Sequence, residues 1–393
     1  MDAWKKELLE WPVDRQSTIP EMADRWYKGE HCHRLASKPQ VRANPAEAVL
    51  FGWLPEKPII SPETRVMALG NCFARNFVLW LGDHGFNLNI PQSPYNSLLR
   101  YSSGLENAAV IAQQFRWAFD EFDPGRTLWV DKDKQLVNVT EQQRETVRES
   151  LRQTDVLLVV LGSSEAWYDK ITNEPLWRAI PVKYYDPERH VFRVESFANT
   201  MRAFEQIDEL RGRHLPALKL IFMVSPGKFA ATFRPVSAIT ANSASKAIVR
   251  AALDEFLRHR WEQVNQRYFY FPSYELAMDC FDSPLAEDNR HLYDYAAAGM
   301  TTLFARHYTT FEAGDGALAT PPAHPNEELL SVIAELENRN KSLQRVCDER
   351  LRVIEELDQA ARERLEVIRR LESDCQVHLK LLGQLPGGEL QTK

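Results

Sequence analysis

The sequence has no apolar run long enough to cross a membrane, no dense cluster of Lys and Arg, and no Cys-x-x-Cys pair. A net charge of -7 and a pI near 5.9 argue against a nucleic-acid-binding surface, because binding to phosphates depends on clustered positive charge. The segment MDAWKKELLEWPVDR at the start contains acidic residues and no apolar core, so we expect no secretory signal. These absences predict a soluble, cytoplasmic protein with no membrane span and no nucleic-acid partner.

Cysteine is scarce and irregularly spaced. The five cysteines are Cys32, Cys72, Cys280, Cys347 and Cys375. An odd number without paired spacing predicts neither a disulfide framework nor a structural zinc site, so we expect reduced thiols. The adjacent ligands His31, Cys32 and His33 lack a second half elsewhere, and we expect no metal and no cofactor.

The stretch from Arg65 to Leu81, RVMALGNCFARNFVLWL, is the one around which the chain is organised. Its apolar run Val66–Leu69 is typical of a strand buried on both faces of a parallel sheet, and Gly70 ends that run. The large side chains that follow recur at helical spacing. This order places Asn71 and Cys72 at a helix N-terminus above the carboxyl end of a strand, where open α/β sheets bind their ligands.

Further strands and helices alternate along the chain, which predicts βαβ units and a three-layer α/β sandwich around a five-stranded parallel sheet. The other expected strands are Phe86–Ile90, Val156–Leu161, Leu218–Val224 and Tyr268–Phe271. Helices are expected at Leu105–Phe119, around Ala244 to Phe256, and from Ala297 to Tyr308. The segment Lys170–Asn199 does not fit this alternation and suggests an inserted lid or hairpin.

The C-terminal part has a different character. Two series of residues recur every seventh position, as the a and d positions of a coiled coil do: Ile333, Asn340, Cys347, Ile354, Ala361, Ile368, Cys375 and Leu382, and, three places behind, Leu336, Leu343, Arg350, Leu357, Arg364, Leu371, His378 and Leu385. Asn at an a position is typical of two-stranded parallel pairing. We expect a homo-oligomer through this coiled coil; the alternative is a single solvated helix folded back on the domain.

These features divide the chain into an N-terminal extension (1–44), an α/β domain (45–312), a linker (313–325), a coiled coil (326–385) and a tail (386–393).

A short acidic and basic segment follows the last expected strand. Asp288 and His291 are three residues apart in a loop that enters the last helix, so both side chains can converge on a group supplied by the first strand-helix turn. The alternative is an ordinary surface pair of His291 with Asp288.

The turn Gly70-Asn71-Cys72-Phe73-Ala74 resembles the Gly-Ser-Cys-Phe-Ala signature of the GSCFA family, relatives of the SGNH (GDSL-like) esterases and acyltransferases. Other segments that resemble the family are Tyr95-Asn96, LGSSEAW from Leu161, SPGKFAATF from Ser225, Ser245-Lys246 and YFPSYE from Tyr270. The resemblance covers about Pro45 to Phe311. It implies an SGNH, flavodoxin-like sandwich that uses no cofactor.

By that resemblance the site combines a nucleophile position at residue 71 with His291 as general base and Asp288 as its orienting partner. Groups that the resemblance or the strand ends place around it are Gly70, Tyr95, Asn96, Ser163, Ser164 and Glu165. Asn96 is either an oxyanion donor or a turn residue, and Glu165 either lines the cleft or caps a helix.

Residue 71 is asparagine, whose carboxamide is a poor nucleophile but one of the best helix N-caps. Cys72 is either a thiol activated at a helix N-terminus or, as we expect, a buried apolar-type cysteine. The sequence therefore leaves two main hypotheses. One is an esterase or O-acyltransferase acting on an acylated carbohydrate. The other is a non-catalytic descendant, a pseudoenzyme, that binds a glycan or acyl group and assembles partners through the coiled coil.

A third hypothesis makes the tail the functional part and the domain its inert cap. The repeated ERLxxIxxL segments of the tail resemble those of some bacterial glycan-assembly proteins, which suggests polysaccharide biosynthesis.

Overall fold

A computed structural model describes residues 35–89, 106–120, 140–176, 180–311 and 327–382. The chain divides into two units, Met1–Pro321 and Pro322–Lys393, and each is described by itself. The expected N-terminal extension, linker and tail lie mostly or wholly outside the described residues, so their boundaries stay predictions.

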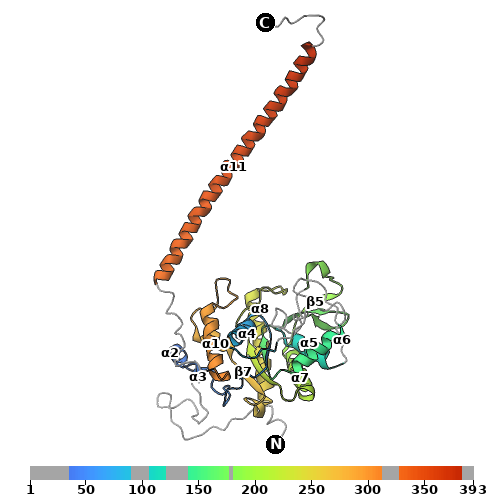
Figure 1. The fold of residues 1–393 in the computed structure, drawn as a ribbon, viewed down its shortest axis with the longest axis vertical. Coiled ribbons are helices and arrows are strands. Elements are labelled where there is room, and N and C mark those ends of the chain that lie inside the picture. The colour runs from blue at the N-terminus through green and yellow to red at the C-terminus, as the bar shows by residue number, and fades with distance from the viewer. Residues whose placement is uncertain (1–34, 90–105, 121–139, 177–179, 312–326, 383–393) are drawn as a thin grey trace. The chain divides into compact units, whose positions relative to one another are not determined.

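The first unit is built on a parallel sheet of four strands in the order β1-β2-β6-β7. Figure 1 shows β7 of this sheet with helices on either side of it. The strands are β1 (Val66–Leu69), β2 (Val156–Leu161), β6 (Lys219–Val224) and β7 (Tyr268–Phe271). Nearly every residue in them is buried, because helices cover both faces of the sheet. The prediction of an α/β fold with a parallel sheet is confirmed.

The helices form two layers, one on each face. Alternate residues of β2 point to opposite sides: Leu158 and Val160 belong to one buried cluster, and Leu157 and Val159 to the other. The first cluster is covered by α4 (Cys72–Asp83), α9 (Ser273–Cys280) and α10 (Asp294–Tyr308). The second is covered by α5 (Ala108–Phe119), α6 (Glu141–Arg152), α7 (Phe197–His214) and α8 (Ala238–Arg258). Shorter helices are α2 (Lys38–Ala43), α3 (Pro45–Ala48), η2 (Val182–Tyr184) and η3 (Trp261–Gln263).

The fifth strand expected at Phe86–Ile90 is present, in the described residues, only as an isolated parallel bridge between Leu88 and Val66. The Asn89 side chain explains why the pairing is short. Its amide donates to the Ser150 carbonyl (2.6 Å) and to the Thr154 hydroxyl (2.8 Å), which ties the segment to the end of α6. Ile90 lies outside the described residues.

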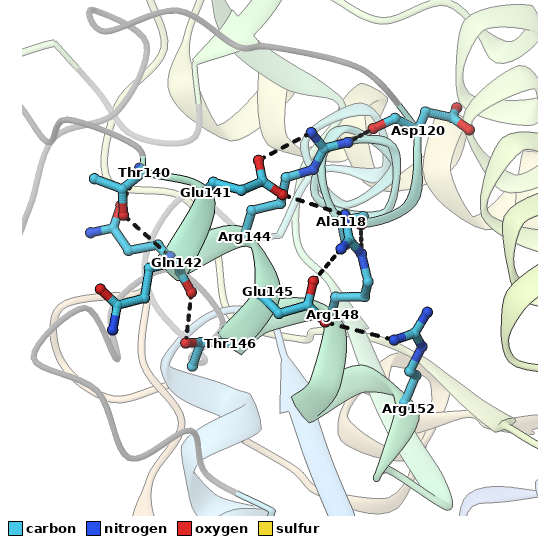
Figure 2. Close-up of polar contacts among 11 residues, drawn as sticks. Ala118, Asp120, Thr140, Glu141, Gln142, Arg144, Glu145, Thr146, Arg148 and Arg152 are labelled. Atoms are coloured by element: carbon cyan, nitrogen blue, oxygen red, sulfur yellow. Dashed lines mark hydrogen bonds and ion pairs between the residues drawn. The ribbon is translucent and has the colours of Figure 1, made fainter.

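Helix α6 was not anticipated, because its sequence is polar apart from Val147 and Leu151. Thr140 begins it with a capping box. Its arginines then bind the C-terminal end of α5: Arg148 Nε donates to the Ala118 carbonyl (2.7 Å), and Arg144 donates to the Asp120 carbonyl (Figure 2). Cations at the end of α5 satisfy carbonyl groups that have no partner within that helix. The polar helix α6 is therefore held in the fold by hydrogen bonds from its arginines to the C-terminal end of α5.

The insertion is a second, antiparallel sheet in the order β4-β3-β5 rather than a simple hairpin. Its strands are β3 (Glu165–Asp169), β4 (Glu174–Leu176) and β5 (His190–Val194). Strand β3 begins directly after the Gly162-Ser163-Ser164 turn that ends β2, so this small sheet lies next to the carboxyl edge of the main one.

The second unit contains α11 (Glu327–Leu382), a continuous helix of 56 residues. The segment from Glu327 to Leu382 contains no Pro or Gly, so no residue in it breaks the helical hydrogen bonding. Whether α11 pairs with another helix is a separate question, so the coiled coil stays a prediction. No helix in the described parts of the chain is long and apolar enough to span a bilayer.

Gly70 at the end of β1 offers a stability test. Its φ is +145°, and a Cβ there would lie 2.6 Å from both the Cβ and the backbone oxygen of Val160. Gly70→Ala should therefore lower the free energy of unfolding by about 2 kcal/mol or more. Gly212→Ala is the matched control, because Gly212 lies in α7 with nothing within 4 Å of the added atom. It should raise stability by about 0.5–1 kcal/mol. Urea titrations of both variants test this, and equal midpoints would contradict it.

Candidate functional site

The turn after β1 places Asn71 as the N-cap of α4. Its Oδ1 accepts from the Phe73 backbone N–H at 3.0 Å, so the prediction that Asn71 caps this helix is confirmed. The Nδ2 group donates one hydrogen bond to Glu106 Oε2 (2.7 Å) and one to Ser225 Oγ (3.0 Å). Both amide hydrogens are thus used, and the side chain lies in a buried position.

Glu106, which the sequence gave no reason to single out, comes from the segment just before α5. Its backbone oxygen accepts from the Gly162 N–H (2.8 Å), which fixes it above the end of β2. A Cβ at Gly162 would lie 2.1 Å from Glu106 Oε2 and 2.9 Å from Asn71 Nδ2. The turn after β2 therefore needs glycine, because the Asn71–Glu106 hydrogen bond occupies that space.

The side chain of Lys246, on α8, also binds the segment that contacts Asn71. It is 2% exposed, and its Nζ donates to the Ser225 carbonyl at 2.6 Å. Burial lowers the pKa of Lys246 to about 8, and the negative charges of Glu106 and Cys72 offset part of that effect. The sequence motif Ser245-Lys246 carries no assigned role. In the structure, Lys246 binds Ser225, which is one of the two residues that accept from the Asn71 amide.

The predicted residues Ser163 and Ser164 are buried at the end of β2. The hydroxyl of Ser245 on α8 accepts from the Ser164 backbone N–H (2.6 Å) and lies 3.3 Å from Ser163 Oγ. These contacts join the β2 turn to α8. Glu165 instead binds the loop after β6, where its carboxylate accepts from Thr232 Oγ1 (2.8 Å) and pairs with Arg234 (3.5 Å).

The Asp288–His291 pair is formed. His291 Nδ1 lies 2.5 Å from Asp288 Oδ2, and the other carboxylate oxygen accepts from the backbone N–H groups of Arg290 and His291. The His291 backbone N–H, the His291 ring and the Arg290 backbone N–H together lower the pKa of Asp288 to about 2. Asp288 is therefore ionised at neutral pH and orients the imidazole. Both side chains are 47% exposed.

The loop that follows β6 links this pair to Asn71. It begins at Ser225, which binds Asn71, and three residues later Lys228 binds the acidic segment. The Lys228 N–H donates to the Arg290 carbonyl (3.1 Å), and its Nζ donates to Asn289 Oδ1 (2.6 Å). His291 makes no direct hydrogen bond to Asn71 or Cys72, all of them described residues. The two parts thus meet through a shared loop.

A comparison with protein-family models matches the GSCFA family over residues 65–304. The chain belongs to the GSCFA family. The resemblance drawn from the motifs is therefore confirmed, and the match spans the strands, the antiparallel insertion and the Asp288–His291 segment. No curated protein matches the chain.

Cys72 differs from the expectation. The thiol is exposed, so the prediction of a buried apolar-type cysteine is wrong. Cys72 is the first residue of α4, one position after the cap, and a step of one helical residue turns its side chain about 100° from Asn71. Phe73 and Ala74, the next two residues, supply the buried face instead. Tyr95 and Asn96 lie outside the described residues.

The GSCFA domain also contains a cavity of about 360 Å³ between the antiparallel sheet and helices α5 and α7. Its lining includes Tyr168, Glu174, Arg193 and Glu195, and none of the predicted site residues. Among the described residues, no group of three or more His, Cys, Asp or Glu side chains could hold a metal ion. The His31-Cys32-His33 run lies outside them.

The buried amine of Lys246 predicts a specific pH dependence. Its folded-state pKa is about 8 against an ordinary 10.5, so between these values the unfolded chain binds more protons. The free energy of unfolding should therefore rise with pH across this window, by at most about 3 kcal/mol. We expect wild type to gain stability relative to Lys246→Met from pH 7.5 to pH 10 in denaturant titrations. Exposed Lys57→Met is the control and should show a constant difference; a constant difference for Lys246→Met would contradict the burial effect.

Proposed function

We propose that this GSCFA domain recognises an acyl ester of a carbohydrate and does so without forming an acyl-enzyme at residue 71. The observation that carries the proposal is the state of the Asn71 carboxamide. Its oxygen caps α4 and both of its amide hydrogens bind Glu106 and Ser225. The nitrogen lone pair of an amide is delocalised into its carbonyl group, and here the oxygen accepts a hydrogen bond as well, so the carboxamide is a poor nucleophile toward an ester carbon.

The Asp288–His291 pair supports recognition of a polar group at this edge. Ionised Asp288 holds Nδ1–H of the ring, which leaves His291 Nε2 as an acceptor toward solvent. Such an acceptor binds a hydroxyl of a ligand, or takes a proton from it when a nucleophile is present. The carbohydrate itself rests on the family resemblance. Polysaccharide biosynthesis rests on the likeness of the tail repeats to those of glycan-assembly proteins, and a cytoplasmic location on the sequence of the N-terminal segment.

A second candidate is a thiol esterase that uses Cys72. It is favoured by one observation, the exposure of Cys72 at the N-terminus of α4 within electrostatic range of Lys246. In that case the thiolate would attack the ester carbonyl, the alkoxide would leave with a proton, and water would release the acyl group.

Hydrolysis of p-nitrophenyl acetate separates these candidates. We expect wild type to be inactive within background and Asn71→Ser to gain activity, because a hydroxyl then occupies the position at which the family resemblance puts the nucleophile, with His291 as its general base. Asn71→Ala is the matched control, since it loses the same hydrogen bonds without supplying a nucleophile. The serine variant should exceed it about a hundredfold, and adding His291→Ala should remove the gain. Wild-type activity that disappears in Cys72→Ala would instead establish the thiol route.

We also propose that α11 associates with α11 of a second copy as a coiled coil. Large apolar side chains along it are between 51% and 64% exposed: Leu343, Ile354, Leu357, Leu365, Ile368 and Leu371. Leu351, Leu365 and Leu379 lie next to the polar d residues Arg350, Arg364 and His378, so the apolar stripe continues past each of them. A helix that leaves such a stripe in water gains stability by covering it.

Analytical ultracentrifugation tests the pairing. The full chain should sediment as a dimer or larger, and a chain ending at Pro325 as a monomer. Ile354→Asp should weaken association because it puts a charge in the seam, whereas Gln359→Asp, on the polar side of the same helix, should not. Equal monomer masses for the full and shortened chains would rule the proposal out.

A further inference from the structure

One face of the antiparallel sheet carries a cluster of aromatic rings. Trp167 on β3 and Phe192 on β5 are direct cross-strand partners, and their ring centroids are 5.4 Å apart. Phe233, from the loop after β6, packs edge-on against Trp167 at 4.8 Å and against Phe192 at 5.1 Å. Tyr185 adds a fourth ring, 5.7 Å from Trp167. We call Trp167, Tyr185, Phe192 and Phe233 the aromatic platform.

Half of this platform faces solvent, since Phe233 is 61% exposed and Tyr185 47% exposed. Burial does not hold the Phe233 ring in place. The residues on either side of it do: Thr232 and Arg234 both bind the carboxylate of Glu165, a side chain that is itself 3% exposed. An exposed phenylalanine fixed by a buried anchor keeps apolar surface in water, which is typical of a contact surface rather than a core.

The platform is continuous with the candidate site through the loop that carries Phe233. Ser225, at the start of that loop, binds Asn71, and Lys228 binds the Asn289 and Arg290 pair next to His291. The same loop therefore has its first residue in the Asn71 network and presents Phe233 near its other end, where Thr232 binds Glu165.

We propose that the aromatic platform binds the apolar C–H face of a pyranose ring, the sugar part of the ligand; this rests on the function proposed above. A pyranose has an apolar face and a hydroxylated edge. The platform offers apolar ring surface at the exposed Phe233, and the exposed Tyr185 adds a hydroxyl to it. Aromatic rings bind such faces with little loss of conformational freedom, because they are already ordered. An acyl chain or a protein partner is the competing occupant.

Saturation-transfer NMR with two probes tests the platform. The probes are methyl 6-O-acetyl-glucopyranoside, which has an ester, an apolar ring face and free hydroxyls, and ethyl acetate, which has only the ester. We expect Phe233→Ala to weaken pyranoside binding about five- to tenfold, and Phe233→Trp to restore it. Ethyl acetate binding should not change. Phe51→Ala is the control, because Phe51 is 59% exposed and lies outside the platform, and it should bind both probes as wild type does.

The outcomes separate the two proposals. If wild type and Phe233→Ala bind the pyranoside equally, and circular dichroism shows that both proteins are folded, the proposal that the platform binds the sugar ring is overturned. Binding of ethyl acetate without the pyranoside would also overturn it while leaving ester recognition intact. Binding of neither probe would refute the proposed function and the platform with it. If Phe233→Ala reduces saturation transfer to the acetyl methyl protons of the pyranoside more than transfer to its pyranose ring protons, the surface binds the acyl group instead.

Discussion

The hydrogen bonds of one carboxamide, that of Asn71, join the parts on which the domain depends. Three chain segments meet at it: the turn after β1, the Glu106 segment just before α5, and the loop after β6. Its two amide hydrogens bind the Glu106 carboxylate and the Ser225 hydroxyl, and its oxygen accepts from the Phe73 N–H, so no polar atom of this buried group lacks a partner. The turn after β2 closes around the same hydrogen bonds, because a Cβ at Gly162 would lie 2.1 Å from Glu106 Oε2 and 2.9 Å from Asn71 Nδ2.

That arrangement limits the chemistry available. In a serine esterase the corresponding atom must be free to leave its hydrogen bonds and attack an ester. Here the buried amine of Lys246 and the carboxylate of Glu106 stand behind the amide as well, so the site is a polar network with matched partners rather than a poised nucleophile. A satisfied buried network stabilises one arrangement of the chain. Among the described residues of the candidate site, His291, Asp288 and Cys72 are exposed to solvent.

The loop from Ser225 to Arg234 contacts both the Asn71 network and the residue that anchors the aromatic platform. Its first residue belongs to the Asn71 network, its middle touches the Asp288–His291 segment, and its end presents Phe233 from the Glu165 anchor. The same loop thus contacts the Asn71 network, the Asp288–His291 segment and the Glu165 anchor of the aromatic platform. We expect a substitution that breaks one of these contacts to alter the position of the loop at the other two. Glu165, predicted to line the cleft or cap a helix, acts here as a buried anchor for the aromatic surface.

The sequence by itself predicted the four strands of the main sheet and the family. Continuous apolar runs such as VLLVVL are typical of strands buried on both faces of a sheet, and the order of motifs along the chain is a property of sequence alone. The sequence also predicted that Asn71 lies at a helix N-terminus. Only the tertiary structure decided that Glu106 binds Asn71 and that Lys246 binds the Ser225 carbonyl, because partners 35 and 21 residues away leave no local pattern. It also decided that Cys72 is exposed and that, in the described part of the segment before residue 90, Leu88 forms a single bridge to β1. Side-chain direction at a helix start and the extent of strand pairing are set by what packs against them, and periodicity cannot encode that.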